Sequence, residues 1–271
     1  MPGINRQRVR TSFHRGAADY DQHTPVQQRV VEQVLSQLHG YQPELCGSVL
    51  DIGCGTGRLL ERLMTRHPEV SLTGLDIAPN MLQQAGDRLG SSVRLIQGDA
   101  EQLPFTDEYF TTVLSSSTFQ WLDSLQTCFR EIRRVLLRDG WFVFSLFGEG
   151  TLCELGECWG QAWQNCGRIE AVAGNGTHRF HTGNDVMQAL ETVGFRDIQL
   201  TTGCEVVWYQ DVPHLLHAVK RIGAGTARPP SGGGLGWRRL LHEMAAIYVD
   251  RYGTAEGIPA SYGVIYAAGR R

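Results

Sequence analysis

A glycine-rich run near residue 50 has the spacing of a ligand-binding turn. Asp51 ends an apolar stretch and is followed by Gly53, Gly55 and Gly57, with Cys54 between the first two glycines. Glycine lets a backbone turn sharply and approach a ligand where a Cβ would collide. The spacing is shared by dinucleotide-binding and nucleoside-binding proteins, and it also fits a plain tight turn. The run alone therefore leaves the ligand open.

Acidic residues at three successive strand ends narrow the choice of ligand. Asp76 follows the next apolar stretch, where a carboxylate can accept hydrogen bonds from both hydroxyls of a ribose. Asp99 follows a third stretch, where it can bond an adenine amino group. Asp51 would repel a pyrophosphate but favour the sulfonium and ammonium cations of S-adenosylmethionine. The three carboxylates therefore indicate S-adenosylmethionine.

Alternating strand-like and helix-like stretches must position these residues. The expected strands are 48–52, 71–75, 93–97, 110–115, 140–147, 195–201 and 261–268. The expected helices are 58–66, 79–89, 124–137, 184–193, 214–221 and 237–251. This rhythm predicts an α/β fold: a doubly wound, Rossmann-like, mostly parallel seven-stranded sheet with helices on both faces.

Three segments fall outside the rhythm. Apolar residues recur at helical spacing within residues 5–40 and predict an N-terminal helical cap over residues 1–44. Residues 150–180 show no clear strand, and residues 211–251 contain a tract rich in glycine and proline. We expect the two later segments to form a lid on one domain that spans residues 1–271.

Composition excludes several function classes. The net charge of −3 gives no overall basic field for nucleic acid. No run approaches the roughly 20 apolar residues of a membrane span, and the N-terminus lacks an apolar signal core, so we expect a cytoplasmic protein. The seven cysteines show no paired spacing, and the pairs His178/His181 and His214/His217 have no convergent acidic partner. We therefore expect no metal site.

Several stretches outside the glycine-rich turn carry a more specific pattern. They are 13–23, Gln120-Trp121, Gly150-Thr151-Leu152, Arg179-Phe180 and 216–224. Together they resemble the malonyl-[acyl-carrier protein] O-methyltransferases of biotin synthesis over nearly the whole chain. The chain departs from that family at Thr111, where the family has Asp, and at Ser116, where it has Asn.

The resemblance implies transfer of a methyl group from S-adenosylmethionine to the free carboxylate of a malonyl thioester. The products would be S-adenosylhomocysteine and the methyl ester that primes pimeloyl chain synthesis for biotin. A carboxylate with a pKa near 4 is already ionised at neutral pH, so no general base is expected and catalysis is by positioning. Malonyl-acyl-carrier protein and malonyl-coenzyme A both fit as substrate, and we expect a monomer.

The resemblance also suggests which residues touch each reactant. Those expected to bind the cofactor are Tyr20, Asp51, Gly53, Cys54, Gly55, Asp76, Ile77, Met81, Asp99, Ala100 and Ser115. Those expected to bind the acceptor are Tyr20, Gln120, Trp121, Arg179 and Lys220. Arg179 would grip the carboxylate with its planar fork, and Lys220 would help to dock the carrier. Core packing also explains Tyr20, Gln120 and Trp121, and an ordinary exposed surface explains the two cations.

Two other functions remain open from the residues. One is methylation of another small carboxylic acid or of a quinone precursor, although a ring carbon needs activation by a base, and none stands out. The other is a non-catalytic methyltransferase-like partner protein. The intact Asp51, Asp76 and Asp99 argue against decay of the site.

Overall fold

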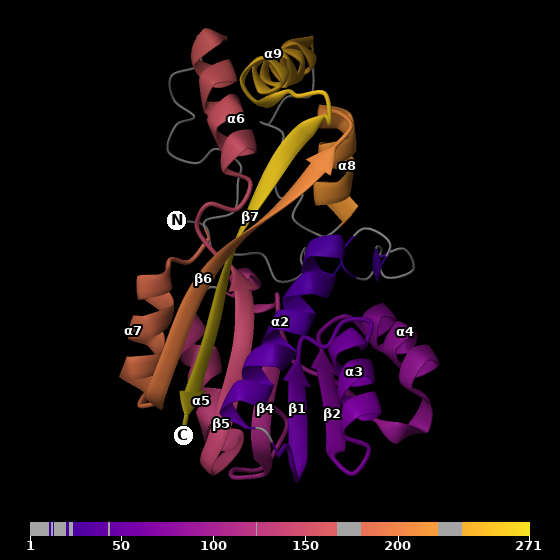
Figure 1. Ribbon diagram of the computed structural model, residues 1–271, viewed down its shortest axis with the longest axis vertical. Coiled ribbons are helices and arrows are strands. Elements are labelled where there is room, and N and C mark those ends of the chain that lie inside the picture. The colour runs from indigo at the N-terminus through magenta and orange to yellow at the C-terminus, as the bar shows by residue number, and fades with distance from the viewer. Residues whose placement is uncertain are drawn as a thin grey trace.

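One seven-stranded sheet organises the residues that the computed structural model describes, which are 11, 13, 20, 21, 24–42, 44–122, 124–166, 180–221 and 235–271 (Figure 1). The strands are β1 (Ser48–Ile52), β2 (Ser71–Asp76), β3 (Arg94–Gln97), β4 (Phe110–Ser116), β5 (Leu136–Phe147), β6 (Arg196–Tyr209) and β7 (Ile258–Arg270). Their order is β3-β2-β1-β4-β5-β7-β6. β1 to β5 run parallel, and β7 pairs antiparallel with β5 and β6. The expected mostly parallel α/β sheet is confirmed.

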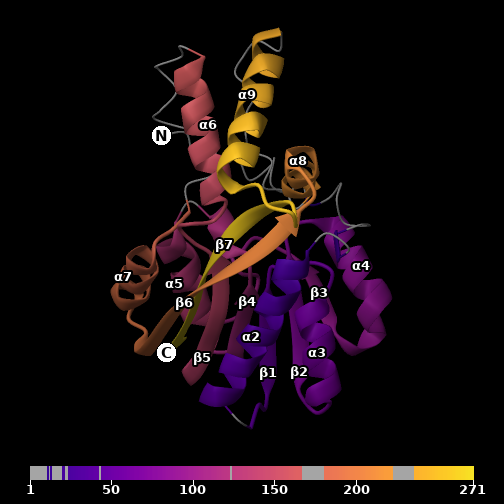
Figure 2. The same ribbon diagram turned by 45° about the horizontal axis from the view of Figure 1, so that its top comes forward.

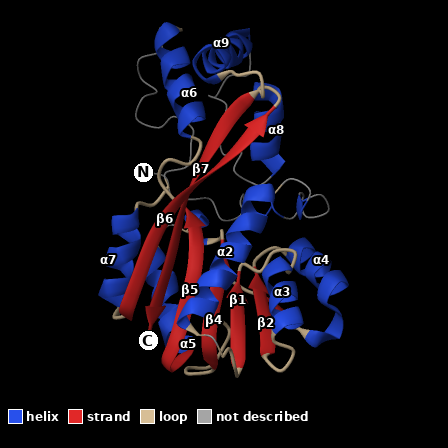
Figure 3. Cartoon of the chain, in the orientation of Figure 1, coloured by secondary structure: helices blue, strands red, loops and turns tan. Residues whose placement is uncertain are grey.

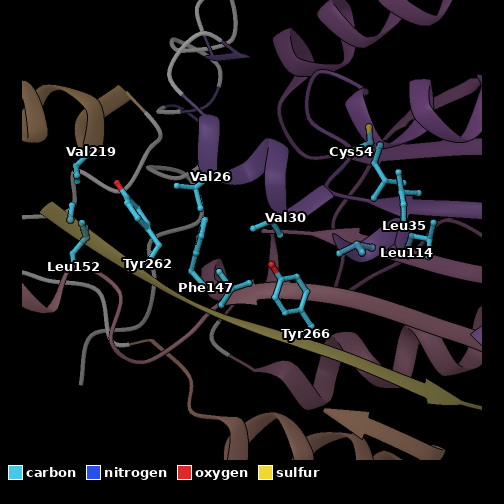
Figure 4. Close-up of a cluster of buried hydrophobic side chains, with 14 of the residues drawn as sticks. Val26, Val30, Leu35, Cys54, Leu114, Phe147, Leu152, Val219, Tyr262 and Tyr266 are labelled. Carbon is cyan, nitrogen blue, oxygen red and sulfur yellow. The ribbon is translucent and has the colours of Figure 1, made fainter. Parts of the chain in front are cut away.

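Helices cover both faces of this sheet (Figure 3). They are α2 (Pro25–Tyr41), α3 (Arg58–Arg66), α4 (Pro79–Leu89), α5 (Leu125–Val135), α6 (Cys153–Asn165), α7 (Gly183–Val193), α8 (Val212–Arg221) and α9 (Leu235–Tyr252), with 3₁₀ turns η2 (Gly90–Ser92) and η3 (Phe119–Trp121). Buried side chains of α2 and α3, with Ala85 and Leu89 of α4, belong to one apolar cluster, and those of α5 and α7 belong to another. Figure 4 shows part of the first cluster, with Val26 and Val30 of α2 near Phe147, Tyr262 and Tyr266. Each face of the sheet therefore has its own core.

A group of three helices, α6, α8 and α9, lies beyond the carboxyl ends of the parallel strands (Figure 2). β6 and β7 have 14 and 13 residues against five in β1, and they extend toward this group. Trp159 of α6 stacks on Trp237 of α9 with ring centroids 5.3 Å apart. Glu154, buried in the first turn of α6, accepts hydrogen bonds from the backbone amide and hydroxyl of Ser261 in β7. The expected lid segments thus meet in one place, and their motion as a lid remains a prediction.

Several expected boundaries need correction. β6 continues eight residues past the expected end at 201, because it pairs with β7 as far as Tyr209. α6 lies inside 150–180, a segment with no clear strand to which no helix was assigned, and its two glycines give it a low helical propensity. Burial of Leu155, Cys158, Trp159 and Ala162 stabilises it instead. Of the helix expected at 5–40, the described part begins at Pro25, apart from isolated residues before it.

No helix in the described part of the chain is long and apolar enough to cross a membrane.

Candidate active site

The glycine-rich turn is fastened to the end of the neighbouring strand. The amides of Gly53 and Cys54 donate to the carbonyl oxygen of Leu75 at 2.7 and 3.0 Å. Gly53 has a φ of +70°, and a Cβ added there would lie 2.2 Å from Oγ1 of Thr118. A side chain at this position would both strain the backbone and collide with the loop after β4. Glycine is therefore required where β1 meets β4.

Asp76 ties the turn to the start of α4. Its Oδ2 accepts the amide of Gly55 at 2.9 Å, and its Oδ1 accepts the amide of Ala78 at 2.8 Å. Burial raises the pKa of the Asp76 carboxyl, and hydrogen bonds from the amides of Ala78, Gly55 and Ile77 oppose that rise. Each oxygen keeps a further lone pair, so the carboxylate can hold the turn and still accept a ligand hydroxyl.

Asp51 is a buried carboxyl group with an unmet hydrogen-bonding requirement. The side chain is 2% exposed, and Oδ1 has no hydrogen-bond partner among the described residues. Burial raises the pKa of the Asp51 carboxyl well above its usual range, and the charge on Asp76 raises it further. A buried carboxylate without a partner destabilises a protein unless a cation or a proton compensates it. The site is therefore prepared for a positively charged ligand.

The first cavity opens at the carboxyl ends of the parallel strands and encloses about 810 Å³, part of it open to solvent. Eight of the eleven residues expected to bind the cofactor line it, namely Tyr20, Gly53, Gly55, Asp76, Ile77, Met81, Asp99 and Ala100. Its other lining residues are Phe13, Ile52, Leu75, Gly98, Ser116, Ser117, Thr118, Trp121 and Leu122. The structure thus brings most of the expected cofactor residues together.

Three expected cofactor residues do not line this cavity. Asp51 directly precedes the lining residues Ile52 and Gly53. Cys54 is buried, and burial raises the pKa of its thiol well above the usual range. Ser115 is fully buried, and its hydroxyl donates to the carbonyl oxygen of Ile52 at 2.7 Å. Ser115 therefore joins β4 to β1 instead of facing the cavity.

The end of β4 and the loop after it supply lining residues that were not among the expected cofactor residues. The hydroxyls of Ser116 and Ser117 are buried and have no hydrogen-bond partner among the described residues. Ser117 has a φ of +55°, which is uncommon for a residue with a side chain and marks a position held by its surroundings. The signal for this loop was available, because ligands bind where parallel strands end.

A second cavity of about 400 Å³ adjoins the first. Its lining residues are Phe13, Tyr20, Gln27, Ser117, Gln120, Trp121, Phe147, Thr151, Leu152, Phe180 and Tyr262. Four residues line both cavities: Phe13, Tyr20, Ser117 and Trp121. The ring of Phe13 meets those of Tyr20 and Trp121 edge to face, with centroids 6.1 and 5.8 Å apart. The rings of Phe13, Tyr20 and Trp121 therefore form an aromatic junction where the two cavities meet.

The residues expected to bind the acceptor have different places. Tyr20 and Trp121 lie at the junction, and Gln120 lines the second cavity. Gln120 is 2% exposed, donates to the carbonyl oxygen of Ser117 at 2.6 Å and accepts the amide of Phe147 at 3.4 Å, so it also holds the loop after β4. Lys220 is exposed on α8 and lines neither cavity.

Arg179 lies outside the described residues. Phe180, which follows it in the chain, lines the second cavity.

Comparison with known proteins decides the family. A family model for a methyltransferase domain matches residues 50–144. The chain is 46% identical to the malonyl-[acyl-carrier protein] O-methyltransferase of Geobacter sulfurreducens, over 99% of this chain and 100% of that protein. The chain belongs to this family. The methyltransferase is also 32% identical to the biotin biosynthesis bifunctional protein BioHC of Teredinibacter turnerae, over 96% of its own length and 46% of that protein.

Solved structures agree on the fold of the methyltransferase. A putative methyltransferase from Bacillus halodurans matches with a TM-score of 0.59 at 17% identity, over 87% of this chain and 97% of that one. The YcgJ protein from Bacillus subtilis matches with a TM-score of 0.57 at 20% identity, over 89% and 98%.

The methyltransferase depends on S-adenosylmethionine, and the first cavity suits that molecule. The unpartnered Oδ1 of Asp51 fits a cationic ligand. Asp76 and Asp99 are placed on the lining for the ribose and adenine roles that the sequence predicts. Those individual roles remain predictions.

The first prediction concerns Asp76. Asp76→Ala should weaken S-adenosylmethionine binding by roughly 1.5–3 kcal/mol, about ten- to a hundredfold in Kd, because charge-assisted hydrogen bonds are lost. It should also lower Tm, because the amides of Gly55 and Ala78 lose their acceptor. Calorimetric titration below the unfolding range separates the two effects. The exposed Asp107 provides a control, Asp107→Ala, and unchanged affinity in Asp76→Ala would remove Asp76 from the site.

The second prediction concerns Asp51. Because the pKa of Asp51 is raised in the folded state, the ligand-free fold loses stability as pH rises from the unfolded value near 4 to the folded value. At neutral pH, Asp51→Asn should raise the Tm of the ligand-free protein by roughly 2–4 °C for each kcal/mol gained. The gain should vanish near pH 4, and the variant should bind S-adenosylmethionine more weakly. A ligand-free Tm that falls at neutral pH would contradict this reading.

Proposed function

We propose that this methyltransferase transfers the methyl group of S-adenosylmethionine to the free carboxylate of malonyl-acyl-carrier protein, the acceptor named for its Geobacter relative. The methyl ester would prime pimeloyl chain synthesis for biotin. The observation that carries the proposal is the junction of Phe13, Tyr20, Ser117 and Trp121 between the two cavities. A donor in one cavity and an acceptor in the other would meet there.

The character of the second cavity suits a carboxylate acceptor. Its described lining includes no acidic, basic or imidazole side chain, so it offers no general base. A malonyl carboxylate is ionised at neutral pH and needs none. S-adenosylmethionine supplies an electrophilic methyl group. The task left to the protein is to hold both reactants in line, and such positioning reaches effective molarities on the order of 10⁵–10⁸ M.

The aromatic junction contributes by excluding water. Phe13, Tyr20 and Trp121 place apolar surface where the two cavities meet. A sulfonium and a carboxylate partly cancel their charges as the methyl moves, so a drier surrounding favours the step. Burial raises the pKa of the Tyr20 hydroxyl, and the charges of Asp76 and Asp21 raise it further. Tyr20 therefore stays protonated and can donate a hydrogen bond.

Two groups are proposed to hold the acceptor carboxylate. Ser117 lines both cavities, and its buried hydroxyl has no partner among the described residues, so we propose that this hydroxyl turns toward the acceptor and donates to it. The hydroxyl of Thr151, in contrast, already lies within hydrogen-bond distance of the carbonyl oxygens of Gly148 and Gly263 at 2.8 and 3.0 Å. We assign the charge-compensating role to Arg179, because it precedes Phe180 of the second cavity and an unpaired buried carboxylate is expensive.

The carrier is proposed to approach over α8, where Lys220 is exposed. We propose that the lysine contacts the phosphopantetheine phosphate or an acidic surface of the carrier protein. Coenzyme A would offer the first of these contacts but not the second. Methylation of another small carboxylic acid fits the same two cavities. Methylation of a quinone ring fits less well, because the described lining offers no base.

The acceptor is tested by mass spectrometry of malonyl-acyl-carrier protein incubated with the enzyme and S-adenosylmethionine. We expect a gain of one methylene unit that mild ester hydrolysis removes. Acetyl-acyl-carrier protein is the matched control and should be inert, because it lacks the acceptor oxygen. A product that resists mild hydrolysis, or equal methylation of the acetyl thioester, would reject carboxyl methylation. Malonyl-coenzyme A in parallel tests the choice of carrier.

The carboxylate clamp is tested by Arg179→Lys, which keeps the charge but loses the planar fork. We expect kcat to fall about ten- to a hundredfold at saturating acceptor, with S-adenosylmethionine affinity unchanged. Arg138→Lys is a suitable control because Arg138 is 88% exposed. Near-normal turnover in Arg179→Lys would remove Arg179 from this role.

A further inference from the structure

Arg88 lies in the last turn of α4 and joins three segments that are distant in sequence. Its Nη1 donates to the carbonyl oxygen and to Oγ1 of Thr56, at 2.6 and 3.0 Å. Its Nη2 donates to Oδ2 of Asp21, and its Nε lies 3.7 Å from Oε1 of Glu61. One side chain therefore connects α4, the glycine-rich turn and the segment before α2.

The contact with Asp21 has a direct link to the cavities. Asp21 follows Tyr20, which lines both cavities, so adjacent Cα atoms of about 3.8 Å spacing couple their positions. The Asp21 carboxylate also accepts the hydroxyl of Thr56 at 2.8 Å, and Nε of Arg58 lies 3.1 Å away. Fixing Asp21 therefore fixes the backbone from which Tyr20 reaches the junction.

The other hydrogen bonds described for Tyr20 and Asp21 do not reach the glycine-rich turn. The carbonyl oxygen of Tyr20 accepts the hydroxyl of Thr24 at 3.1 Å, and that of Asp21 accepts Nε2 of Gln28 at 2.9 Å. Both contacts go to α2 or its first flanking residue. Among the described hydrogen bonds and ion pairs of Tyr20 and Asp21, those of the Asp21 carboxylate are the ones that reach the cofactor side, at Thr56 of the glycine-rich turn, Arg58 of α3 and Arg88 of α4.

The ion pair between Arg88 and Asp21 is partly buried. The side chains of Arg88 and Asp21 are 23% and 21% exposed, less than half the exposure of the pair between Arg62 and Glu32. Burial raises the pKa of Asp21, but hydrogen bonds from Arg88, Thr56 and Arg58 outweigh it and hold the pKa below its usual range. Charge-assisted bonds of this kind exceed an exposed surface pair in strength.

We propose that Arg88 is a positioning residue that latches the Tyr20 segment onto the glycine-rich turn. While Arg88 and Asp21 are paired, the glycine-rich turn and the Tyr20 segment hold S-adenosylmethionine as one unit, although Arg88 lines neither cavity. The latch rests on the proposed cofactor site but not on the identity of the acceptor. A test that reads cofactor binding therefore fails or succeeds independently of the malonyl assignment.

The test uses three variants of the full chain, Arg88→Ala, Asp21→Asn and the double variant. S-adenosylhomocysteine is titrated by calorimetry, and hydrogen exchange is followed in the peptide that carries Tyr20. We expect each single variant to bind about tenfold more weakly, and the double variant to be no worse than either one. Ligand should slow exchange of the peptide in the wild type and lose this effect in the variants. Arg88→Lys should recover part of the affinity, because it restores the charge without the fork.

The control is Arg62→Ala, which removes an exposed ion pair with Glu32 at 2.9 Å on the neighbouring helix α3. It should leave both affinity and exchange unchanged. A purely structural role for Arg88 would lower Tm but leave Kd and the ligand effect on exchange intact, and that result would overturn the latch. Single losses that add in the double variant would overturn it as well, since the two residues would then act separately. Asp21→Asn keeps the test valid if Arg88→Ala fails to fold.

Discussion

Negative charge buried at the carboxyl ends of β1 and β2 is the constraint on which the site depends. Parallel strands bring Asp51 and Asp76 to the same edge of the sheet. Burial raises the pKa of both carboxyls, and the charge of Asp76 raises that of Asp51 further. Asp76 offsets part of this charge by accepting the amides of Gly55 and Ala78, and so shapes the turn. Asp51 keeps an oxygen without a partner among the described residues. Ionisation of Asp51 is therefore costly in the ligand-free fold, and a cationic ligand lowers that cost. This favours a methyl donor with a sulfonium and an ammonium over a dinucleotide.

The remaining elements bring an acceptor to that donor. The loop after β4 presents Ser117 to both cavities, and Gln120 holds the loop by hydrogen bonds to Ser117 and Phe147. The segment before α2 adds Tyr20, and α6, α8 and α9 gather beyond the same edge of the sheet. Polar contacts between elements anchor several of these parts, as when Glu154 of α6 accepts two hydrogen bonds from Ser261. The catalytic contribution of such a site is geometry, because the proposed acceptor arrives already ionised.

Local sequence patterns were sufficient to predict the sheet and the acidic residues at the strand ends. Apolar stretches alternate with amphipathic ones, so β1 to β4 and the positions of Asp76 and Asp99 follow from sequence. Three features could not be predicted, because they depend on tertiary contacts. α6 is helical through burial against α9, and the outer half of β6 is a strand through pairing with β7. Arg88 had no motif of its own, since its partners Thr56 and Asp21 are 32 and 67 positions away. At Ser115 the strand end was located to within one residue, and alternation of side chains turned the chosen residue inward.

The match between Asp51 and S-adenosylmethionine is tested most directly by the protons exchanged when the cofactor binds. Calorimetric titrations in buffers of different ionisation enthalpy, at about pH 5 to 7, measure that exchange while the ligand's own amino group, with a pKa near that of other α-amino groups, stays largely protonated. Because the Asp51 pKa is raised in the ligand-free fold, a bound cation should lower it and release protons to the buffer. We expect net proton release by the wild type and no such release by Asp51→Asn. Binding without proton release, or equal release in both proteins, would contradict the claim that the buried charge of Asp51 is matched to the cofactor.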